Sequence, residues 1–234
     1  MIIAGHQLHY LPGMRFFAKI IACDKFILVD HVQFVKKEWQ NRNKIKTRNG
    51  PMWLTVPVLV KGKFDQNINE VEIDNNSNWG RTHWRSLELN YAKADYFESF
   101  RDFFEGIYKK RWSKLVDLNW MILEFLLKEL SIDKEIVFSS SLNFIGTSTD
   151  LLIEMCQKMK GNTYLSGQQA KTYVDLEKFK AAGLKHIFMR FNYPTYKQLH
   201  GNFISNLSIV DALFNCGSKE TRKLLEDNIE FEKS

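Results

Sequence analysis

The sequence predicts a three-layer α/β fold with a mainly parallel sheet. Short apolar runs typical of buried strands alternate with helix-like stretches near both ends of the chain. Strands separated by helices of this length form parallel sheets with helices on both faces. The middle of the chain breaks the alternation. We therefore expect one domain over residues 1–234, with a β-rich insertion at about 45–75 and a helical insertion at about 77–130.

The first elements form a strand, helix, strand unit. "MIIAGHQ" reads as a buried strand, "MRFFAKIIAC" as a helix and "KFILVD" as a second apolar strand. The apolar side of that helix carries Phe16, Phe17, Ile20 and Ile21. In the β-rich insertion, the turns "RNGP" and "KGKF" separate β-rich runs, which predicts one or two antiparallel hairpins.

The helical insertion holds three helix-like stretches: "SNWGRTHWRSLELNYAK", "DYFESFRDFFEGIYKK" and "SKLVDLNWMILEFLLKEL". Ser113 is the expected N-cap of the third stretch. Alternation then resumes, with strands at "EIVFSS", "TYLSG" and "HIFMRF". Between them we expect a helix behind Thr147 or Ser148 and a helix that ends at Gly183.

Composition limits the class of protein. The 234 residues are 44% hydrophobic, enough for a substantial core. The net charge of +6 favours anionic partners such as nucleotides, phosphosugars, nucleic acid or a membrane surface. No run approaches the roughly 20 apolar residues of a membrane helix, and the start lacks the pattern of a secretion signal. The three cysteines show no paired or zinc-like spacing, so we expect a cytoplasmic protein.

Polar residues follow three of the predicted strands. Ligands of open parallel sheets bind beyond the carboxyl ends of the strands. For any single residue, a turn or a helix cap explains the polarity equally well. The repetition favours a shared site. The residues in question are Gly5, His6, Gln7, Asp30, Gln33, Ser166, Gly167 and Gln168.

His6 and His9 form a His-x-x-His pair just before the first predicted helix. In nucleotidyltransferase-like, Rossmann-like domains, such an arrangement lets imidazoles donate hydrogen bonds to phosphate oxygens, with help from the helix N-terminus. A zinc site is less well supported, because no third ligand stands at a suitable spacing. We expect a phosphate site here and no metal.

The segment from Gln33 to Arg48 is the densest polar cluster. It carries six basic residues against one acid, interleaved with Trp39 and several amide side chains. Basic groups suit phosphates, amides suit sugar hydroxyls and base edges, and an indole stacks on rings. An anionic, sugar-bearing ligand fits this chemistry. A basic exposed loop or an RNA-binding surface is the alternative on composition alone.

Four motifs resemble the WbqC-like protein family. They are "HQLHYLPG", "VDHVQFVKKEWQNRNKIKT" with "WLTVPV", "TYLSG" and "LSIVDALFNCG", and they span nearly the whole chain in this order. The first motif departs from the usual His-Gln-Pro-Asn-Tyr-Leu-Pro-Trp at Leu8, His9 and Gly13, and His31 stands where a second Asp is common. The resemblance implies a role in bacterial surface-polysaccharide (O-antigen) synthesis, where some members have been suggested to be glycine transferases acting on amino sugars.

The expected enzyme joins a small acyl group, such as glycine, to the amino group of a nucleotide-linked amino sugar. If ATP with magnesium activates the acid, His6 holds phosphates, Lys36 or Arg42 neutralises the leaving group, and Asp30 deprotonates the sugar ammonium. If the donor is an aminoacyl-tRNA, the basic segment binds it. The residues expected to bind substrate are Gln7, His9, Tyr10, Gln33, Lys36, Trp39, Gln40, Asn41, Arg42, Lys44, Lys46, Ser166 and Gly167.

Two other classes of function stay open. One is a non-catalytic protein of the same pathway that binds a nucleotide-sugar or acts as a scaffold. The other is an RNA-binding protein. RNA binding through many phosphates weakens steeply with salt, whereas a small-molecule pocket keeps its selectivity for the sugar, so a salt titration separates these classes.

Overall fold

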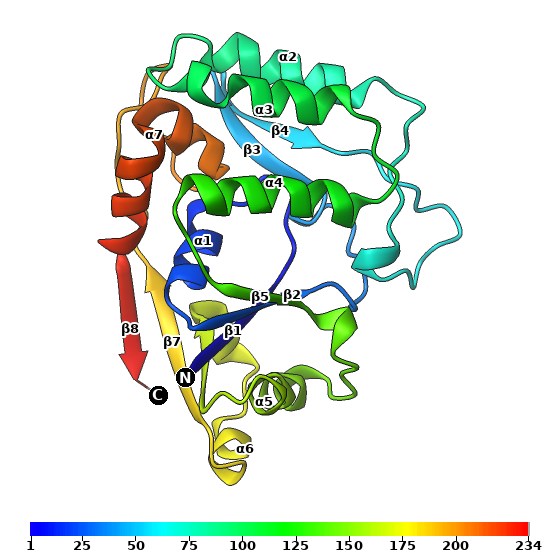
Figure 1. Cartoon of the computed structure of the whole chain (residues 1–234), viewed down its shortest axis with the longest axis vertical. Coiled ribbons are helices and arrows are strands. Elements are labelled where there is room, and N and C mark those ends of the chain that lie inside the picture. The colour runs from blue at the N-terminus through cyan, green and yellow to red at the C-terminus, as the bar shows by residue number, and fades with distance from the viewer. Residues whose placement is uncertain (234) are drawn as a thin grey trace.

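A computed structural model describes residues 1–233 of the chain. Its main sheet has six strands in the order β5-β2-β1-β6-β7-β8 (Figure 1). The first five of these strands run parallel, and β8 pairs with β7 in the antiparallel sense. The strands are β1 (Ile2–Gln7), β2 (Lys25–Val29), β5 (Glu135–Phe138), β6 (Thr163–Gly167), β7 (Lys185–Phe191) and β8 (Ile229–Lys233).

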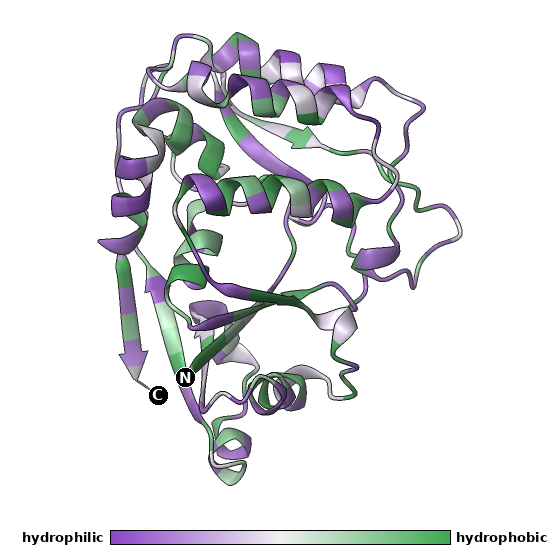
Figure 2. Ribbon diagram, in the orientation of Figure 1, coloured by the Kyte–Doolittle hydropathy of each residue, from purple (hydrophilic) through white to green (hydrophobic). Residues whose placement is uncertain are grey.

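Helices cover both faces of this sheet, which confirms the predicted three-layer α/β fold. On one face lie α1 (Met14–Ile21) and α7 (Ile209–Glu226), which pack against each other. On the other face lie α5 (Ser148–Lys158) and α6 (Leu176–Ala181), at the bottom of Figure 1. The strands β1 and β2 between these layers are mostly hydrophobic, as expected for buried parallel strands (Figure 2).

The strand order reverses beside β1. From β1 the chain moves outward through β2 and β5 on one side, and later through β6, β7 and β8 on the other. Such a switch point leaves a crevice between the loops that leave β1 and β6 at their carboxyl ends. His6 pairs in register with Leu28 of β2, and Asp30 directly follows that strand. Ser166 lies at the same end of β6, so the three lie at one edge of the sheet, as expected.

The chain between β2 and β5 carries one hairpin and three helices. The hairpin pairs β3 (Arg42–Thr47) with β4 (Gly50–Thr55) through the "RNGP" turn. The segment after β4 forms no further hairpin, only isolated bridges and the short 3₁₀ helix Ile68–Glu70. Its backbone bonds instead to the residues just after β2, from the Ile68 N–H to the Val32 carbonyl and from the Asn69 N–H to the Asp30 carbonyl.

The three helices of this region begin and end close to the expected positions. They are α2 (Trp79–Tyr91), α3 (Phe97–Lys109) and α4 (Leu115–Glu129), and in Figure 1 α2 and α3 lie over the β3–β4 hairpin. The expected N-cap of α4 is wrong by one residue, because Lys114 takes that position. Ser113 instead accepts a hydrogen bond at its carbonyl from the Ile73 N–H, which ties the start of α4 to the preceding loop.

Helix α7 and strand β8 have no counterpart among the predicted elements. Ser208 caps α7, with its side chain accepting from the Val210 N–H. The helix is kinked at Gly217, whose φ of 75° suits glycine and where a Cβ would lie 2.7 Å from the Tyr96 ring. Within residues 1–233, no helix combines the length and apolar character that a bilayer crossing requires.

Candidate functional site

A pocket of about 390 Å³ opens at the switch point of the sheet. We call it the switch-point pocket. Its walls come from the ends of β1 and β6, from α1 and from the start of α5. None of the described residues that line it is acidic, whereas Arg15 and Lys19 both line it. The surplus of positive charge makes the pocket suited to an anionic ligand.

Lys19 is the most unusual residue of the pocket. It lies on α1 and is only 8% exposed. Its Nζ donates to the Gly5 carbonyl at 2.7 Å, and no ion pair joins it to an acid within residues 1–233. Burial lowers its pKa to about 8. A buried cation without a counter-charge is costly, so an anion bound beside Lys19 would stabilise it.

Lys19 is not among the residues that the sequence motifs predict, although its surroundings are visible in the sequence. Helix α1 buries five other residues, all apolar, around this one lysine. A lysine that lies among the buried apolar residues of a short helix cannot reach solvent easily, and such buried ionisable groups are enriched at functional sites.

The N-terminus of α1 adds to the positive character of the pocket. Gly13 is its N-cap and lines the pocket, but no side chain caps the helix there, and the first turn holds no acidic residue. The first N–H groups of a helix lack intrahelical partners, and the helix dipole places positive potential on them. Arg15 in this first turn is exposed and contributes a guanidinium group.

His6 and His9 lie side by side at the same mouth, with ring centroids 4.6 Å apart. His6 Nδ1 is 3.0 Å from the Gln7 carbonyl. A carbonyl only accepts, so Nδ1 carries the proton. Burial, reinforced by Lys19, lowers the pKa of His6 to about 3, and burial also holds the pKa of His9 well below its usual range.

The protonation state of His6 changes the role expected from the sequence. A neutral imidazole has one N–H, and in His6 that group is used by the Gln7 carbonyl. Nε2 therefore carries a lone pair and accepts rather than donates. His6 therefore does not suit the donation of hydrogen bonds to phosphate. Its Nε2 is a proton acceptor, but a weak one in the unliganded protein because its pKa is about 3. Lys19 and Arg15 are the better phosphate donors.

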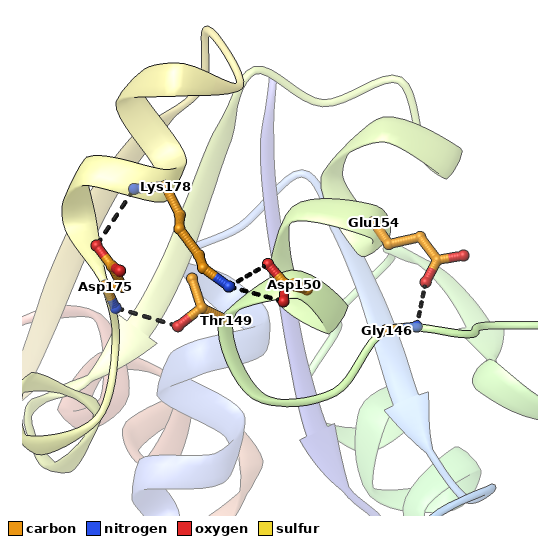
Figure 3. Close-up of polar contacts among 6 residues, drawn as sticks. All are labelled: Gly146, Thr149, Asp150, Glu154, Asp175 and Lys178. Atoms are coloured by element: carbon orange, nitrogen blue, oxygen red, sulfur yellow. Dashed lines mark hydrogen bonds and ion pairs between the residues drawn. The ribbon is translucent and has the colours of Figure 1, made fainter.

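The wall formed by α5 is fixed by polar contacts near its N-terminus (Figure 3). Lys178 of α6 binds both carboxylate oxygens of Asp150 at 2.8 Å. Thr149 Oγ1 accepts from the Asp175 N–H at 3.1 Å, and Glu154 accepts two backbone N–H groups from the loop before α5. This wall is therefore held to α6 and to its own leading loop, which keeps the pocket shape defined.

Ser166 and Gly167 bring the end of β6 to the pocket. Ser166 Oγ is 3.0 Å from Nε2 of His186 on β7. Burial, with a smaller effect from Lys19, lowers the pKa of His186 to about 4, so this imidazole is neutral at physiological pH. Ser166 thus lines the pocket with a hydroxyl that is held by a fixed neighbour.

Only part of the expected site comes together here. The predicted residues that line the switch-point pocket are His6, Gln7, His9, Trp39, Ser166 and Gly167. The predicted residues that lie outside it are Tyr10, Asp30, Gln33, Lys36, Gln40, Asn41, Arg42, Lys44 and Lys46. The contacts of this second group explain why.

Asp30 reaches the correct edge of the sheet, but its carboxylate is already occupied. It is 3% exposed and accepts from Ser139 Oγ at 2.8 Å, and from the backbone N–H and Oγ of Ser140 at 2.8 and 2.7 Å. Tyr10 is fully buried, and its hydroxyl hydrogen-bonds with His83 and Tyr108. Both side chains are therefore engaged in hydrogen bonds within the protein.

The basic segment is largely bound to the protein itself. Arg42 and Lys44 lie over the Trp53 ring, with Arg42 Cζ 4.1 Å and Lys44 Nζ 4.8 Å from its centroid. Lys46 is 1% exposed and donates to Gln198 and to the Asn202 carbonyl. Trp39 packs against Trp53. It was expected to bind substrate, and it lines the switch-point pocket.

The amides of this segment fix loops, and its first residues lie on the surface. Gln40 donates to Gln7 Oε1 at 2.8 Å, so it positions a pocket residue from behind. Asn41 donates to the Val56 carbonyl. Gln33 and Lys36 are exposed, the first donating to the Phe64 carbonyl and the second lying over the Phe64 ring.

The donor set of the pocket does not fit a magnesium ion held by the protein. Magnesium prefers carboxylate oxygens, and the described lining offers none. Across residues 1–233, no group of three His, Cys, Asp or Glu side chains is arranged to hold a metal ion. We therefore derive no step through a metal.

Comparisons with known proteins identify the family of the chain. No solved structure matches the chain. The uncharacterized protein Rv1507c of Mycobacterium tuberculosis (strain ATCC 25618 / H37Rv) is 37% identical over 219 residues, which cover 93% of this chain and 94% of that protein. The model of the WbqC-like protein family matches residues 7–223, a range that contains the lining residues of the switch-point pocket other than Gly5 and His6. The chain belongs to the WbqC-like protein family.

Proposed function

We propose that the protein is a transferase or ligase that attaches a small acyl group, such as glycine, to the amino group of a nucleotide-linked amino sugar. The observation that carries the proposal is the acid-free pocket with the buried, unpaired Lys19 at the switch point of the sheet. Membership of the WbqC-like family, which is associated with O-antigen biosynthesis, supports surface-polysaccharide synthesis as the pathway.

The diphosphate of the sugar nucleotide accounts for the charge of the pocket. Lys19 would place its remaining N–H donors on phosphate oxygens, and Arg15 would add a planar, two-pronged contact from the mouth. The uncapped N-terminus of α1 contributes backbone donors. Trp39 offers a ring face for a base or a sugar.

Amide formation requires a free amine and an activated carboxyl group. The amine nitrogen attacks the carbonyl carbon, the leaving group departs with its bonding electrons, and the amine loses a proton. Nε2 of His6 is the acceptor we assign to that proton. A bound diphosphate offsets the charges of Lys19 and Arg15, which lower the pKa of His6, so substrate binding makes His6 a stronger base.

Two forms of activated donor are compatible with these residues. ATP would supply an acyl phosphate or an acyl adenylate, and an aminoacyl-tRNA would supply an ester. In both cases the same amide is formed. We propose the cytoplasm as the compartment, because Cys23, Cys156 and Cys216 are free thiols of the kind that a reducing environment maintains.

The test is a direct assay. The purified protein is incubated with glycine, with ATP and magnesium or with glycyl-tRNA, and with a panel of amino-sugar nucleotides, and products are identified by mass spectrometry. We expect one sugar to gain a glycyl group, and Lys19→Met to abolish the product. Lys134→Met is the matched control, because Lys134 also donates to a backbone carbonyl but does not line the pocket.

The outcomes separate the alternatives. Binding of a sugar nucleotide without product from either donor would favour the non-catalytic binding protein. Absence of binding to every amino-sugar nucleotide of the panel would contradict the proposal.

A further inference from the structure

A second concave surface lies at the turn of the β3–β4 hairpin. It is a groove of about 1090 Å³ between the β3–β4 turn, helix α2 and the loop at Leu199 and His200. We call it the hairpin groove. No residue lines both this groove and the switch-point pocket, so the two sites are separate.

Four basic side chains line the hairpin groove: Arg48, Arg81, Arg85 and Lys93. All four are exposed. Within the described residues none of them forms an ion pair or a side-chain hydrogen bond, although ten lysine, arginine and acid pairs occur elsewhere. Glu88 is the single acid among the described lining residues. The groove therefore carries positive charge that the protein does not neutralise.

The arrangement of these charges indicates an extended ligand. Arg81 and Arg85 are four residues apart on α2 and share a face of the helix. Lys93 follows the end of that helix, and Arg48 faces the row from the hairpin turn. At 1.5 Å per residue, the helical part of the row, from Arg81 to Tyr91, spans roughly 15 Å, and Lys93 lies beyond it. A single phosphate or diphosphate cannot contact charges spread over that length, whereas a chain of phosphates can.

The other polar groups favour a nucleic acid strand. Asn49 and Asn90 offer amides, and Thr82 and Ser86 offer hydroxyls, between the charged residues. Side chains of these types contact phosphate and sugar oxygens in nucleic acid complexes, including the 2′-hydroxyl of RNA. A flat membrane surface fits less well, because the charges line a concavity. We infer that the hairpin groove binds the phosphate backbone of a single-stranded RNA segment.

The inference is independent of the reaction proposed for the switch-point pocket. The probe is a fluorescent twelve-nucleotide oligouridylate, and its affinity for the full chain is measured by anisotropy between low and moderate salt. With four phosphates neutralised, the slope of log affinity against log salt is expected to be about −2.8, at about −0.7 per contact for a single strand.

The variants localise the binding. Arg85→Gln and Lys93→Gln should each reduce the slope by about 0.7 and weaken binding roughly twofold to fivefold. Lys180→Gln removes the same charge from α6, where the side chain is 81% exposed and outside the groove, and should leave both values nearly unchanged. Thermal melts check that each variant is folded.

Three results would overturn the inference. They are the absence of RNA binding at low salt, RNA binding that Arg85→Gln and Lys93→Gln leave unchanged, and binding to anionic phospholipid vesicles without binding to the oligonucleotide. Weaker binding and a smaller salt slope in the groove variants but not in Lys180→Gln support it.

Discussion

The switch-point pocket and the segment from Gln33 to Arg48 both carry an excess of positive charge, but the charged side chains have different partners. In the segment, Arg42 lies over Trp53, and Lys46 donates to groups near Gln198. In the pocket, Lys19 is buried with a backbone carbonyl as its hydrogen-bond partner and without a counter-charge. The comparison shows that the density of charge along the sequence does not tell which charges lack a counter-charge in the folded protein, and on that ground Lys19 is the candidate ligand contact.

The largest expected effect is a loss of stability at acidic pH. It should come from the buried histidines of the pocket and of the neighbouring core, because the segment from Gln33 to Arg48 contains no histidine. Burial lowers the pKa of His6 to about 3 and those of His83 and His186 to about 4. The unfolded chain takes up these protons near pH 6.5, while the folded protein does not. Stability is therefore fully present above about pH 6.5 and falls as the pH drops toward about 4.

Urea denaturation at several pH values measures this effect. We expect the midpoint to fall steadily from about pH 6.5 to about pH 4.5. A midpoint that stays constant over this range would show that these histidines are not held neutral by burial.

The next effect is on ligand binding. Lys19→Met should weaken the affinity for uridine diphosphate glucosamine by about tenfold to a hundredfold, because one charge-assisted contact contributes about 1.5–3 kcal/mol. The melting temperature should be unchanged or higher, since the substitution removes a buried charge. Isothermal titration calorimetry and thermal melts measure the two quantities. Equal affinity in the variant and the natural protein would remove Lys19 from the site.

Replacement of Asp30 should have the opposite effect to replacement of Lys19, because it should change stability and leave the ligand affinity unchanged. Asp30→Ala leaves Ser139 and Ser140 without their shared acceptor and should lower the free energy of unfolding by about 1–3 kcal/mol. The affinity of the folded fraction for the sugar nucleotide should not change. Full stability combined with lost activity would instead restore Asp30 as the catalytic base expected from the sequence.

The smallest effect is expected in the basic segment. The sequence predicts that Arg42→Ala weakens nucleotide-sugar binding about tenfold, as the loss of a charged phosphate contact would. The position of Arg42 over Trp53 predicts instead a loss of about 0.5–1 kcal/mol of stability and an affinity within about twofold of the natural protein. Calorimetry of Arg42→Ala and Lys19→Met, measured in parallel, decides between these two expectations. A larger loss of affinity in Arg42→Ala than in Lys19→Met would show that the basic segment contributes more to ligand binding than Lys19 does.

Local patterns were sufficient to predict the edge of the sheet where the site lies. Apolar runs identify β1, β2 and β6, and parallel strands bring His6, Asp30 and Ser166 to one side. Local patterns also predict most of the helices. Helix α7 is not among them, because its motif "LSIVDALFNCG" contributes only to the family resemblance.

The hydrogen bonds of several predicted site residues are made to residues far away in the chain, which local patterns do not show. Asp30 is saturated by Ser139 and Ser140, which follow it by more than 100 residues, and Lys46 donates to Gln198, 152 residues later. Neither partner stands near its target in the sequence, so no local pattern could have predicted these contacts. Lys19 is different, because a lysine within an apolar helix is visible in the sequence itself.

The central claim is that Lys19 binds a diphosphate in the switch-point pocket, and proton uptake on binding tests it most directly. Free Lys19 has a pKa of about 8, and a bound diphosphate raises that pKa. Titration with uridine diphosphate N-acetylglucosamine at about pH 8, in buffers of different ionisation enthalpy, should give an uptake of about half a proton per ligand. Lys134→Met should keep this uptake, and Lys19→Met should lose it. No uptake in the natural protein, or equal uptake in Lys19→Met, would contradict the account.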